Sequence, residues 1–249
     1  MKKNKSVHLF TIREVRAADI LLVGLLLASG ALLGWWRTAQ ADVSMRHDLV
    51  RRARLVADGI DPRSVARLSG SETDRTTPEY HRIKKQSVSL IAAFPDCRFI
   101  SLVGRRPDGS LFLYFDSEPE GSPDESAPGE SYAPADSLLL HAFDEGRSVV
   151  AGPFMDMWGS LVSAWVPVVE PDTRKTLFVV ALDIDGNRWR HAARRAGIEP
   201  NLASVALAFV FVGWRMLATL RSHRKRSAYR WYHRYAEALA VAAAGVVLT

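Results

Sequence analysis

The sequence is poor in cysteine, since Cys97 is the single one among its 249 residues. One thiol excludes a disulfide framework and any zinc or iron–sulfur site built from several cysteines of one chain. Enzyme signatures are also missing: the 7 histidines form no H-E-x-x-H pair, and there is no G-x-S-x-G elbow or phosphate-binding loop. We therefore expect no catalytic residue, metal site or cofactor in this chain. The alternative is a membrane-anchored enzyme with an unrecognised site.

The middle of the chain has no excess of basic over acidic residues. The net charge is +6, yet residues 37–199 carry 21 Lys/Arg and 24 Asp/Glu, a net of −3. The two ends therefore hold an excess of +9, and there it flanks apolar runs. A nucleic-acid surface would interleave basic and aromatic residues within a folded face. The distribution excludes nucleic acid as a partner and indicates the cytoplasmic flanks of membrane spans.

The first apolar run predicts a transmembrane helix over residues 17–36, after a basic cytoplasmic N-terminus of residues 1–16. Residues 20–36 carry no charge, and Trp35 and Trp36 stand at the far end, as in an interfacial aromatic belt. A cleaved signal peptide is the alternative, because Ala39-Gln40-Ala41 fits a cleavage site. Either interpretation takes the following segment out of the cytoplasm.

The C-terminal part predicts a second transmembrane helix over residues 200–220, with Arg215 near its cytoplasmic end. Residues 221–234 then form a basic cytoplasmic loop. A third apolar run begins, and we expect residues 235–249 to start a truncated third span. The alternative is an interfacial C-terminal helix, because the run is too short to cross a bilayer comfortably.

Residues 37–199 predict one extracytoplasmic domain with its own core. Helical periodicity occurs first, and strand-like apolar runs with Asp-Gly and Pro-Asp turns follow. This order favours an α+β fold, an antiparallel sheet with long N-terminal helices on one face, flanked by the transmembrane helices. The expected helices are 37–58, 78–94, 136–145 and 186–196, and the expected strands are 98–104, 111–116, 149–152, 160–169 and 176–184.

Two blocks of residues resemble the Cache-type, PAS-like extracytoplasmic sensor domains of bacterial membrane sensors. The resemblance implies the input domain of a sensor histidine kinase or a diguanylate cyclase. It implies a homodimer in the bacterial inner membrane, with the sensor facing the periplasm or exterior. The blocks contain Arg105-Arg106-Pro107-Asp108-Gly109, Asp116-Ser117-Glu118-Pro119, Gly121-Ser122-Pro123-Asp124, Tyr132, Gly152-Pro153, Asp156, Trp158-Gly159, Ser163, Val166-Pro167, Asp183-Ile184-Asp185 and Trp189.

In this fold the resemblance implies a small-molecule ligand on the sheet face away from the long helix. Such a pocket needs apolar walls and a few fixed polar groups. An arginine suits a ligand carboxylate, and aspartates at strand ends suit an amine. The alternatives are core packing for the aromatic residues, turns or caps for the aspartates and a structural ion pair for the arginine. The candidate ligand-binding residues are Arg98, Tyr114, Asp116, Tyr132, Asp156, Trp158 and Asp183.

An acidic loop follows the second expected strand. Oxygen ligands of this kind suit hard cations, so a divalent-cation sensor is one interpretation. A solvated surface loop and a lid over the ligand pocket are the others. The acidic residues are Asp116, Glu118, Glu120, Asp124, Glu125, Glu130 and Asp136.

Gly30 and Gly34 form a small-xxx-small motif inside the first expected span. Small residues let two helices approach closely in lipid, so this pair is a candidate dimerisation site. Together these features predict the ligand-sensing input region of a transmembrane signalling protein, first of all a sensor histidine kinase. The alternatives are a diguanylate cyclase input and a stand-alone, membrane-anchored module that binds a solute or partner.

Overall fold

The computed structural model describes residues 17–132, 137–156 and 158–247, without the side chains of residue 92 and residues 223–247. The expected N-terminal segment 1–16 and Asp136 lie outside the described residues. The chain divides into two compact units, Arg37–Ala196 and a second unit that combines Met1–Trp36 with Gly197–Thr249. Each is described separately below.

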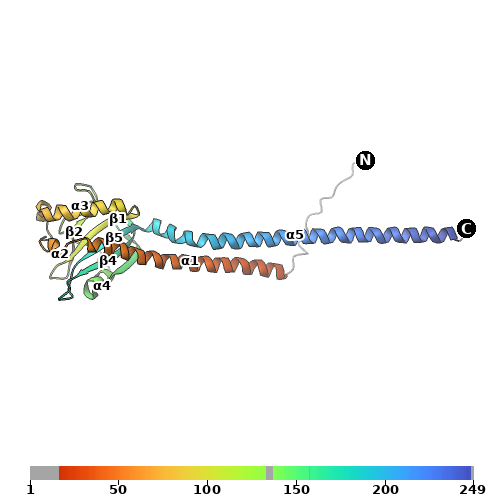
Figure 1. The fold of residues 1–249 in the computed structure, drawn as a ribbon, viewed down its shortest axis with the longest axis horizontal. Helices are drawn as coiled ribbons and strands as arrows, with labels where there is room; N and C mark the ends of the chain where they lie inside the picture. The colour runs from red at the N-terminus through yellow and green to blue at the C-terminus, as the bar shows by residue number, and fades with distance from the viewer. Residues whose placement is uncertain (1–16, 133–136, 157, 248–249) are drawn as a thin grey trace. The chain divides into compact units, whose positions relative to one another are not determined.

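The unit Arg37–Ala196 is built on an antiparallel sheet of five strands in the order β2-β1-β5-β4-β3 (Figure 1). This confirms the predicted α+β class. The helices of the chain are α1 (Ala17–Asp58), α2 (Pro62–Val65), η2 (Glu72–Thr76), α3 (Pro78–Ala93), α4 (Ser137–Glu145) and α5 (Gly186–Val247). The strands are β1 (Cys97–Arg105), β2 (Leu111–Asp116), β3 (Val149–Asp156), β4 (Gly159–Val169) and β5 (Thr176–Asp185).

Helix starts follow the capping residues. Asp61 accepts the Arg63 amide at the start of α2, and Thr77 accepts the Tyr80 amide at the start of α3. In both helices proline occupies the first turn, where its missing N–H costs no hydrogen bond. Local capping chemistry therefore fixes these two starts.

Both faces of the sheet are covered, as the nearly continuous apolar strands predicted. One core packs α1 and α3 against the sheet, with Leu49, Ala53 and Tyr80 fully buried. The other packs α4 against β3, β4 and β5, around Leu139 and Trp165. Figure 1 shows α3 and α4 on opposite sides of the strands. The long helices α1 and α3 therefore cover one face of the sheet, and α4 covers β3, β4 and β5 on the other face.

Strand β3 is longer than predicted. The expected strand stops at Gly152, but β3 continues to Asp156. Its register with β4 shifts between Ala151 and Phe154. Because β3 is an edge strand, the missing N–H of Pro153 removes no bond to a further strand. The extension places Asp156 at the end of the sheet.

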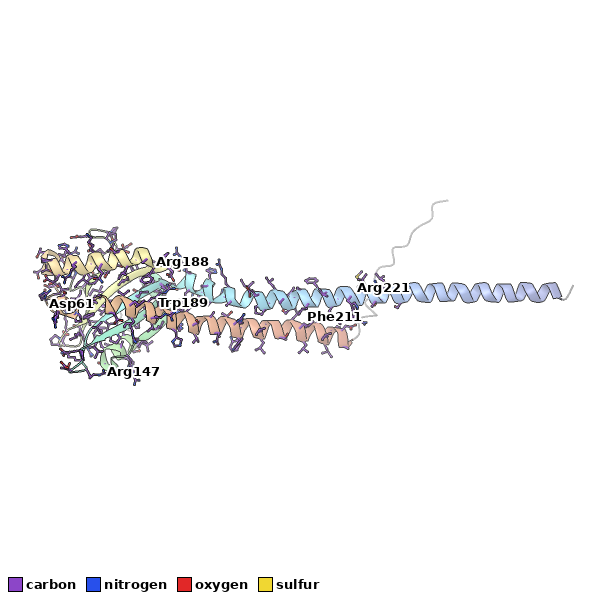
Figure 2. The ribbon with its side chains drawn as sticks, in the orientation of Figure 1. Asp61, Arg147, Arg188, Trp189, Phe211 and Arg221 are labelled. Carbon is purple, nitrogen blue, oxygen red and sulfur yellow. The ribbon has the colours of Figure 1, made fainter. Side chains whose placement is uncertain are left out.

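The second unit contains the apolar parts of α1 and α5. Among the described residues, two helical segments are long and apolar enough to cross a membrane, Ala17–Asp58 and Gly186–Ser222. Figure 2 shows side chains standing outward along both, Phe211 among them. The assignment of residues 17–36 and 200–220 as spans stays a prediction.

The C-terminal part differs from the prediction. Residues 221–234, expected as a loop, are helical, and residues up to Val247 continue the same helix α5. Residues 248–249 lie outside the described part. The physical reason is composition, since residues 221–234 contain no glycine or proline and many good helix formers. The third span over residues 235–249 stays a prediction.

Candidate functional site

Five of the seven predicted ligand-binding residues line one small cavity. It has a volume of about 40 Å³ and lies on the α4 side of the sheet, away from α1 and α3. Asp116 and Asp156 end their strands, Asp183 lies near the end of β5, and Tyr132 and Trp158 come from loops. We call this cavity the Asp183 pocket. Its lining is Phe99, Ser101, Leu113, Asp116, Asp124, Ser126, Tyr132, Phe154, Asp156, Trp158, Leu161, Ser163 and Asp183.

Asp183 is a buried carboxylate in the lining of the Asp183 pocket. The residue is 6% exposed, and its Oδ1 has no hydrogen-bond partner within the described part of the chain. Ser163, directly opposite on β4, hydrogen-bonds the carboxylate through its side chain. Burial, reinforced by the nearby charge of Asp156, raises the pKa of Asp183 to about 7. A proton therefore moves on and off this group near neutral pH.

The other two predicted aspartates also hold turns. Asp116 Oδ2 accepts the Ser126 amide at 2.7 Å, and Oδ1 accepts the Glu118 amide at 3.1 Å. Burial raises the pKa of Asp116, although these bonds and Lys84 oppose the shift. Asp156 Oδ1 accepts the Trp158 amide at 2.9 Å in the turn between β3 and β4. Both interpretations of these residues, turn and pocket wall, thus fit the geometry.

The walls of the Asp183 pocket are largely aromatic. Phe99 and Trp158 meet edge to face with ring centroids 6.4 Å apart, and Phe154 stacks on Trp165 at the same separation. Burial raises the pKa of the Tyr132 hydroxyl. Tyr132 reaches the pocket because residues 129–132 return beside β2, where the Tyr132 amide donates to the Leu111 carbonyl at 3.0 Å. This return also covers the edge of β2.

Tyr114 does not reach the Asp183 pocket. The β1–β2 register pairs Leu102 with Phe115 and Val103 with Leu113, so Tyr114 is the extra residue of a β-bulge. Tyr114 packs against the α1 and α3 core, and its ring centroid lies 4.7 Å from that of Phe112. Because of the bulge, Tyr114 and Asp116, two residues apart in sequence, lie on opposite faces of the sheet.

Arg98 also lies outside the pocket lining. Its guanidinium stacks over the Phe99 ring at 5.1 Å, and the residue is exposed. The register between β1 and β5 shifts between Cys97 and Phe99, which takes Arg98 out of the alternation. Arg98 is thus placed beside the aromatic wall rather than against the cavity, and the structure gives no support to its predicted role as a carboxylate partner.

Sequence reasoning missed several lining residues. Ser101 and Ser163 are buried hydroxyls on the strands adjoining β5, and Ser126 and Asp124 come from the acidic loop. A signal was present, because serines interrupt two otherwise apolar strands. A polar residue on a buried strand needs a partner or a ligand.

The acidic loop is tied to the core by buried charges. Lys84 of α3 and Glu125 form an ion pair whose side chains are 7% and 4% exposed. Arg75 Nη1 reaches both Glu125 oxygens at 3.2 Å, and the Gly121 amide donates at 2.8 Å. Although burial raises the pKa of Glu125, these partners lower it on balance. No group of three or more possible metal ligands occurs among the described residues.

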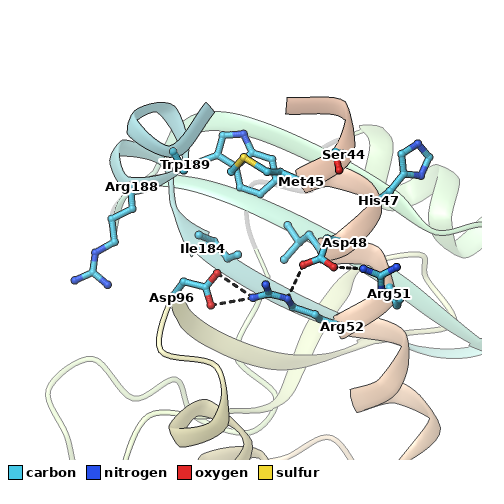
Figure 3. A pocket seen from close by; sticks show the side chains of 12 residues that line it. Ser44, Met45, His47, Asp48, Arg51, Arg52, Asp96, Ile184, Arg188 and Trp189 are labelled. Atoms are coloured by element: carbon cyan, nitrogen blue, oxygen red, sulfur yellow. Dashed lines mark hydrogen bonds and ion pairs between the residues drawn. The ribbon is translucent and has the colours of Figure 1, made fainter. Parts of the chain in front are cut away.

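A larger cavity of about 450 Å³ lies between the α1 segment 44–52 and the start of α5 (Figure 3). Arg52 holds both Asp96 oxygens at 3.0 and 2.9 Å and Asp48 at 2.8 Å, while Asp48 also pairs with Arg51. These charges satisfy one another. The larger cavity therefore shows no unpartnered buried polar group among its described lining residues, unlike the Asp183 pocket.

In the second unit, the small-residue motif packs within the chain. A Cβ atom added to Gly30 would lie 2.0 Å from the Ser204 Oγ, and one on Gly34 would lie 2.4 Å from the Asn201 Nδ2. Both glycines therefore face α5. The predicted dimerisation surface at Gly30 and Gly34 is covered by the same chain, because glycine permits this close helix approach.

Comparison with known proteins gives no match to a family model and none to a curated protein. Among solved structures, the sensory domain of the chemoreceptor Tlp3 from Campylobacter jejuni, with isoleucine bound, gives a TM-score of 0.41 and 12% identity over 70% of this chain. The periplasmic domain of RsbU from Chlamydia trachomatis gives 0.41 and 14% over 71%. The third GAF domain of Slr1393 from Synechocystis gives 0.28 and 12% over 52%, with 98% of that chain covered.

The first two matches cover 65% and 56% of the lengths of those chains, so this chain spans less than two thirds of either. The three scores lie below 0.5.

Proposed function

We propose that this chain is the extracytoplasmic ligand-sensing input region of a transmembrane signal-transduction protein. The observation that carries the proposal is Asp183, a buried carboxylate with an unpartnered oxygen, at the wall of a cavity in a compact unit. A buried oxygen of this kind is costly unless a ligand or water supplies a donor. The two apolar helical segments support attachment of this unit to a membrane.

The proposed mechanism is a population shift. Asp183 lies near the end of β5, which leads directly into α5 at Gly186. At that start the Trp189 Nε1 donates to Asp42 of α1 at 2.7 Å, and Arg46 pairs with Asp42 and stacks on Trp189. A ligand that favours one arrangement of β5 would bias this junction of α1 and α5. A coupling of about 1–3 kcal/mol suffices for such a shift.

The proposed orientation follows the basic flanks. Basic residues beside apolar spans mark the cytoplasmic side, so residues 1–16 and 221–234 lie inside and Arg37–Ala196 outside. In a bacterium this places the sensor in the periplasm or exterior and the helices in the inner membrane. The finer proposal is a homodimeric sensor histidine kinase, with a diguanylate cyclase as the other output, and it is supported by the resemblance alone.

Cysteine accessibility in intact cells tests the orientation. In a Cys97→Ala background, Asp172→Cys in the exposed β4–β5 turn should react with a membrane-impermeant maleimide. Arg221→Cys should react after lysis and not before. Labelling of Arg221→Cys alone in intact cells would contradict an extracytoplasmic sensor.

A distance measurement tests the relay. Spin labels at Val212 of α5 report the separation of the second spans in a dimer. A compound that stabilises the protein through the Asp183 pocket should change that distance. An unchanged distance at a saturating concentration of the compound would contradict the relay and would support a binding module that does not transmit a signal.

A further inference from the structure

The lining of the Asp183 pocket carries charge of one sign. Four carboxylates line it, from Asp116, Asp124, Asp156 and Asp183, and no Lys, Arg or His belongs to its lining among the residues that the structure describes. The hydroxyls of Ser101, Ser126 and Ser163 add polar oxygens. Within a poorly solvated cavity, like charges repel strongly and an opposite charge is attracted. A ligand carboxylate would therefore meet repulsion from every charged group of the lining.

Two neighbouring cations, Lys84 and Arg75, already have acidic partners. Lys84 pairs with Glu125 and lies 3.8 Å from Asp116, so it offsets that carboxylate from the α3 side. Arg75 pairs with Glu125 and Glu72. Arg98 stacks on the outer wall at Phe99. Lys84 and Arg75 therefore do not offset the negative charges of Asp156 and Asp183, which line the cavity.

The unpartnered Asp183 Oδ1 is a second observation, independent of the acidic lining. The residue is more than nine-tenths buried, lines the cavity and leaves this oxygen without a donor. Ser163 supplies one hydrogen bond to the carboxylate. An N–H group would supply the missing donor and a compensating charge.

The dimensions of the cavity limit the ligand. A water molecule needs roughly 10–15 Å³ of such volume, and the cavity offers about 40 Å³. Ammonium or methylammonium fits this space. Phe99 and Trp158 line the same cavity, and aromatic rings attract cations.

We propose that the Asp183 pocket binds a small organic ammonium ion that carries no carboxylate, with the ammonium N–H groups donating to Asp183. The inference rests on the proposed sensing function and narrows the class of ligand. Methylammonium is the smallest organic member of that class.

Binding of such a cation displaces a proton. Because burial raises the pKa of Asp183 to about 7, the empty pocket holds a proton there in mildly acidic solution. The polar and titratable groups around Asp183 are those of the lining and the thiol of Cys97 on β1. The lining groups are Ser163 on β4, Ser101 on β1, Asp156 on β3, Asp116 on β2, Asp124 and Tyr132. Their charges are negative or zero. Affinity for the cation should therefore rise with pH through neutrality.

Calorimetric titration of the full chain in nanodiscs tests this inference. The probes are methylammonium chloride, glycine and sodium acetate at constant ionic strength, at pH 6 and pH 8. We expect methylammonium alone to bind, about tenfold more weakly at pH 6 than at pH 8, since one proton competes with an apparent pKa near 7. Proton release, measured in two buffers of different ionisation enthalpy, should accompany binding at pH 6.

Asp183→Asn keeps the shape of the protonated side chain and should abolish methylammonium binding. Asp172→Asn, the same change at an exposed turn, should leave binding intact. Ser163→Ala is the second variant, expected to weaken binding if Asp183→Asn fails to fold. Equal affinity in the two Asn variants would overturn the inference. Binding of glycine or acetate without methylammonium would overturn it while leaving a ligand-sensing function in place. Absence of binding by all three probes would also overturn it, and a thermal-shift screen of other small molecules against the parent and Asp183→Asn then decides the sensing function separately.

Discussion

Lys84 on α3 and Glu125 in the loop after β2 form an ion pair with both side chains buried. The adjacent residues Asp124 and Ser126 line the Asp183 pocket. The ion pair therefore holds one wall of the pocket against α3. Removing one partner of a buried pair leaves an uncompensated charge, which is more costly than losing the whole pair.

We expect Lys84→Met to destabilise the protein by about 3 kcal/mol, the lower part of the range for such pairs, because Arg75 still contacts Glu125. Urea unfolding of the full chain in detergent, followed by near-UV circular dichroism, measures the change. Lys85→Met, on the exposed side of the same helix, is the control and should shift stability by less than about 0.5 kcal/mol. Equal shifts in the two variants would show that the ion pair contributes nothing.

Gly30→Leu should disrupt the packing of α1 against α5, because the new Cβ would lie 2.3 Å from the Ser204 Cβ. Gly24→Leu is the matched control, since a Cβ at Gly24 has nothing within 4 Å. Spin labels at Leu22 and Val212, in a Cys97→Ala background, report the separation of the helices. We expect a broadened distance distribution for Gly30→Leu alone. An unchanged distribution with loss of a dimer would instead support the dimerisation role predicted from the sequence.

Asp19 and Arg215 form an ion pair at 2.7 Å within the apolar segments of α1 and α5. We expect Asp19→Asn and Arg215→Gln each to lower the thermal stability of the full chain in nanodiscs. The double variant should lose less than the sum, with a coupling of about 0.5–3 kcal/mol. Additive losses would mean that the two charges do not stabilise each other.

The contribution of Asp183 to the stability of the protein should fall as pH rises from about 4 to about 7. The folded state keeps a proton on Asp183 up to pH about 7, whereas the unfolded state releases it near 3.8. In this window the folded state binds more protons, so unfolding becomes easier as pH rises, by at most about 1.4 kcal/mol per pH unit. Asp183→Asn should remove this slope and be more stable than the parent at pH 8.

Urea midpoints of the parent and Asp183→Asn at pH 5 and pH 8 measure this effect. Asp172→Asn serves as the control for a carboxylate that is exposed. A parent and an Asp183→Asn variant with the same dependence on pH would contradict the burial of an ionisable Asp183.

Much of the fold could be predicted because it is encoded locally. The proline and capping residues at Pro62, Thr77 and Pro78 set helix starts, and nearly continuous apolar runs indicate the strands. The ends of the strands were harder to predict, because the effect of a strand-breaking residue such as proline depends on its tertiary context. The expected strand 149–152 was too short, because β3 continues through Pro153, whose missing N–H is harmless on an edge strand.

The candidate site was predicted less completely, because bulges change which face a side chain takes. Asp183 and Asp116 are recognisable as polar residues at the ends of apolar strands. Tyr114 and Arg98 were misplaced, since register shifts at Val103 and Phe99 are a property of strand pairing rather than of one strand. The burial of Glu125 depends on Lys84, 41 residues away in sequence, and no local pattern reveals it.

The most direct test is a thermal-shift screen of small molecules against the full chain in nanodiscs, repeated with Asp183→Asn and with Arg188→Gln. Arg188 lines the larger cavity and not the Asp183 pocket. If the Asp183 pocket is the sensing site, stabilising compounds should lose their effect in Asp183→Asn and keep it in Arg188→Gln. Compounds that still stabilise Asp183→Asn but not Arg188→Gln would place ligand binding in the larger cavity and contradict the proposed site.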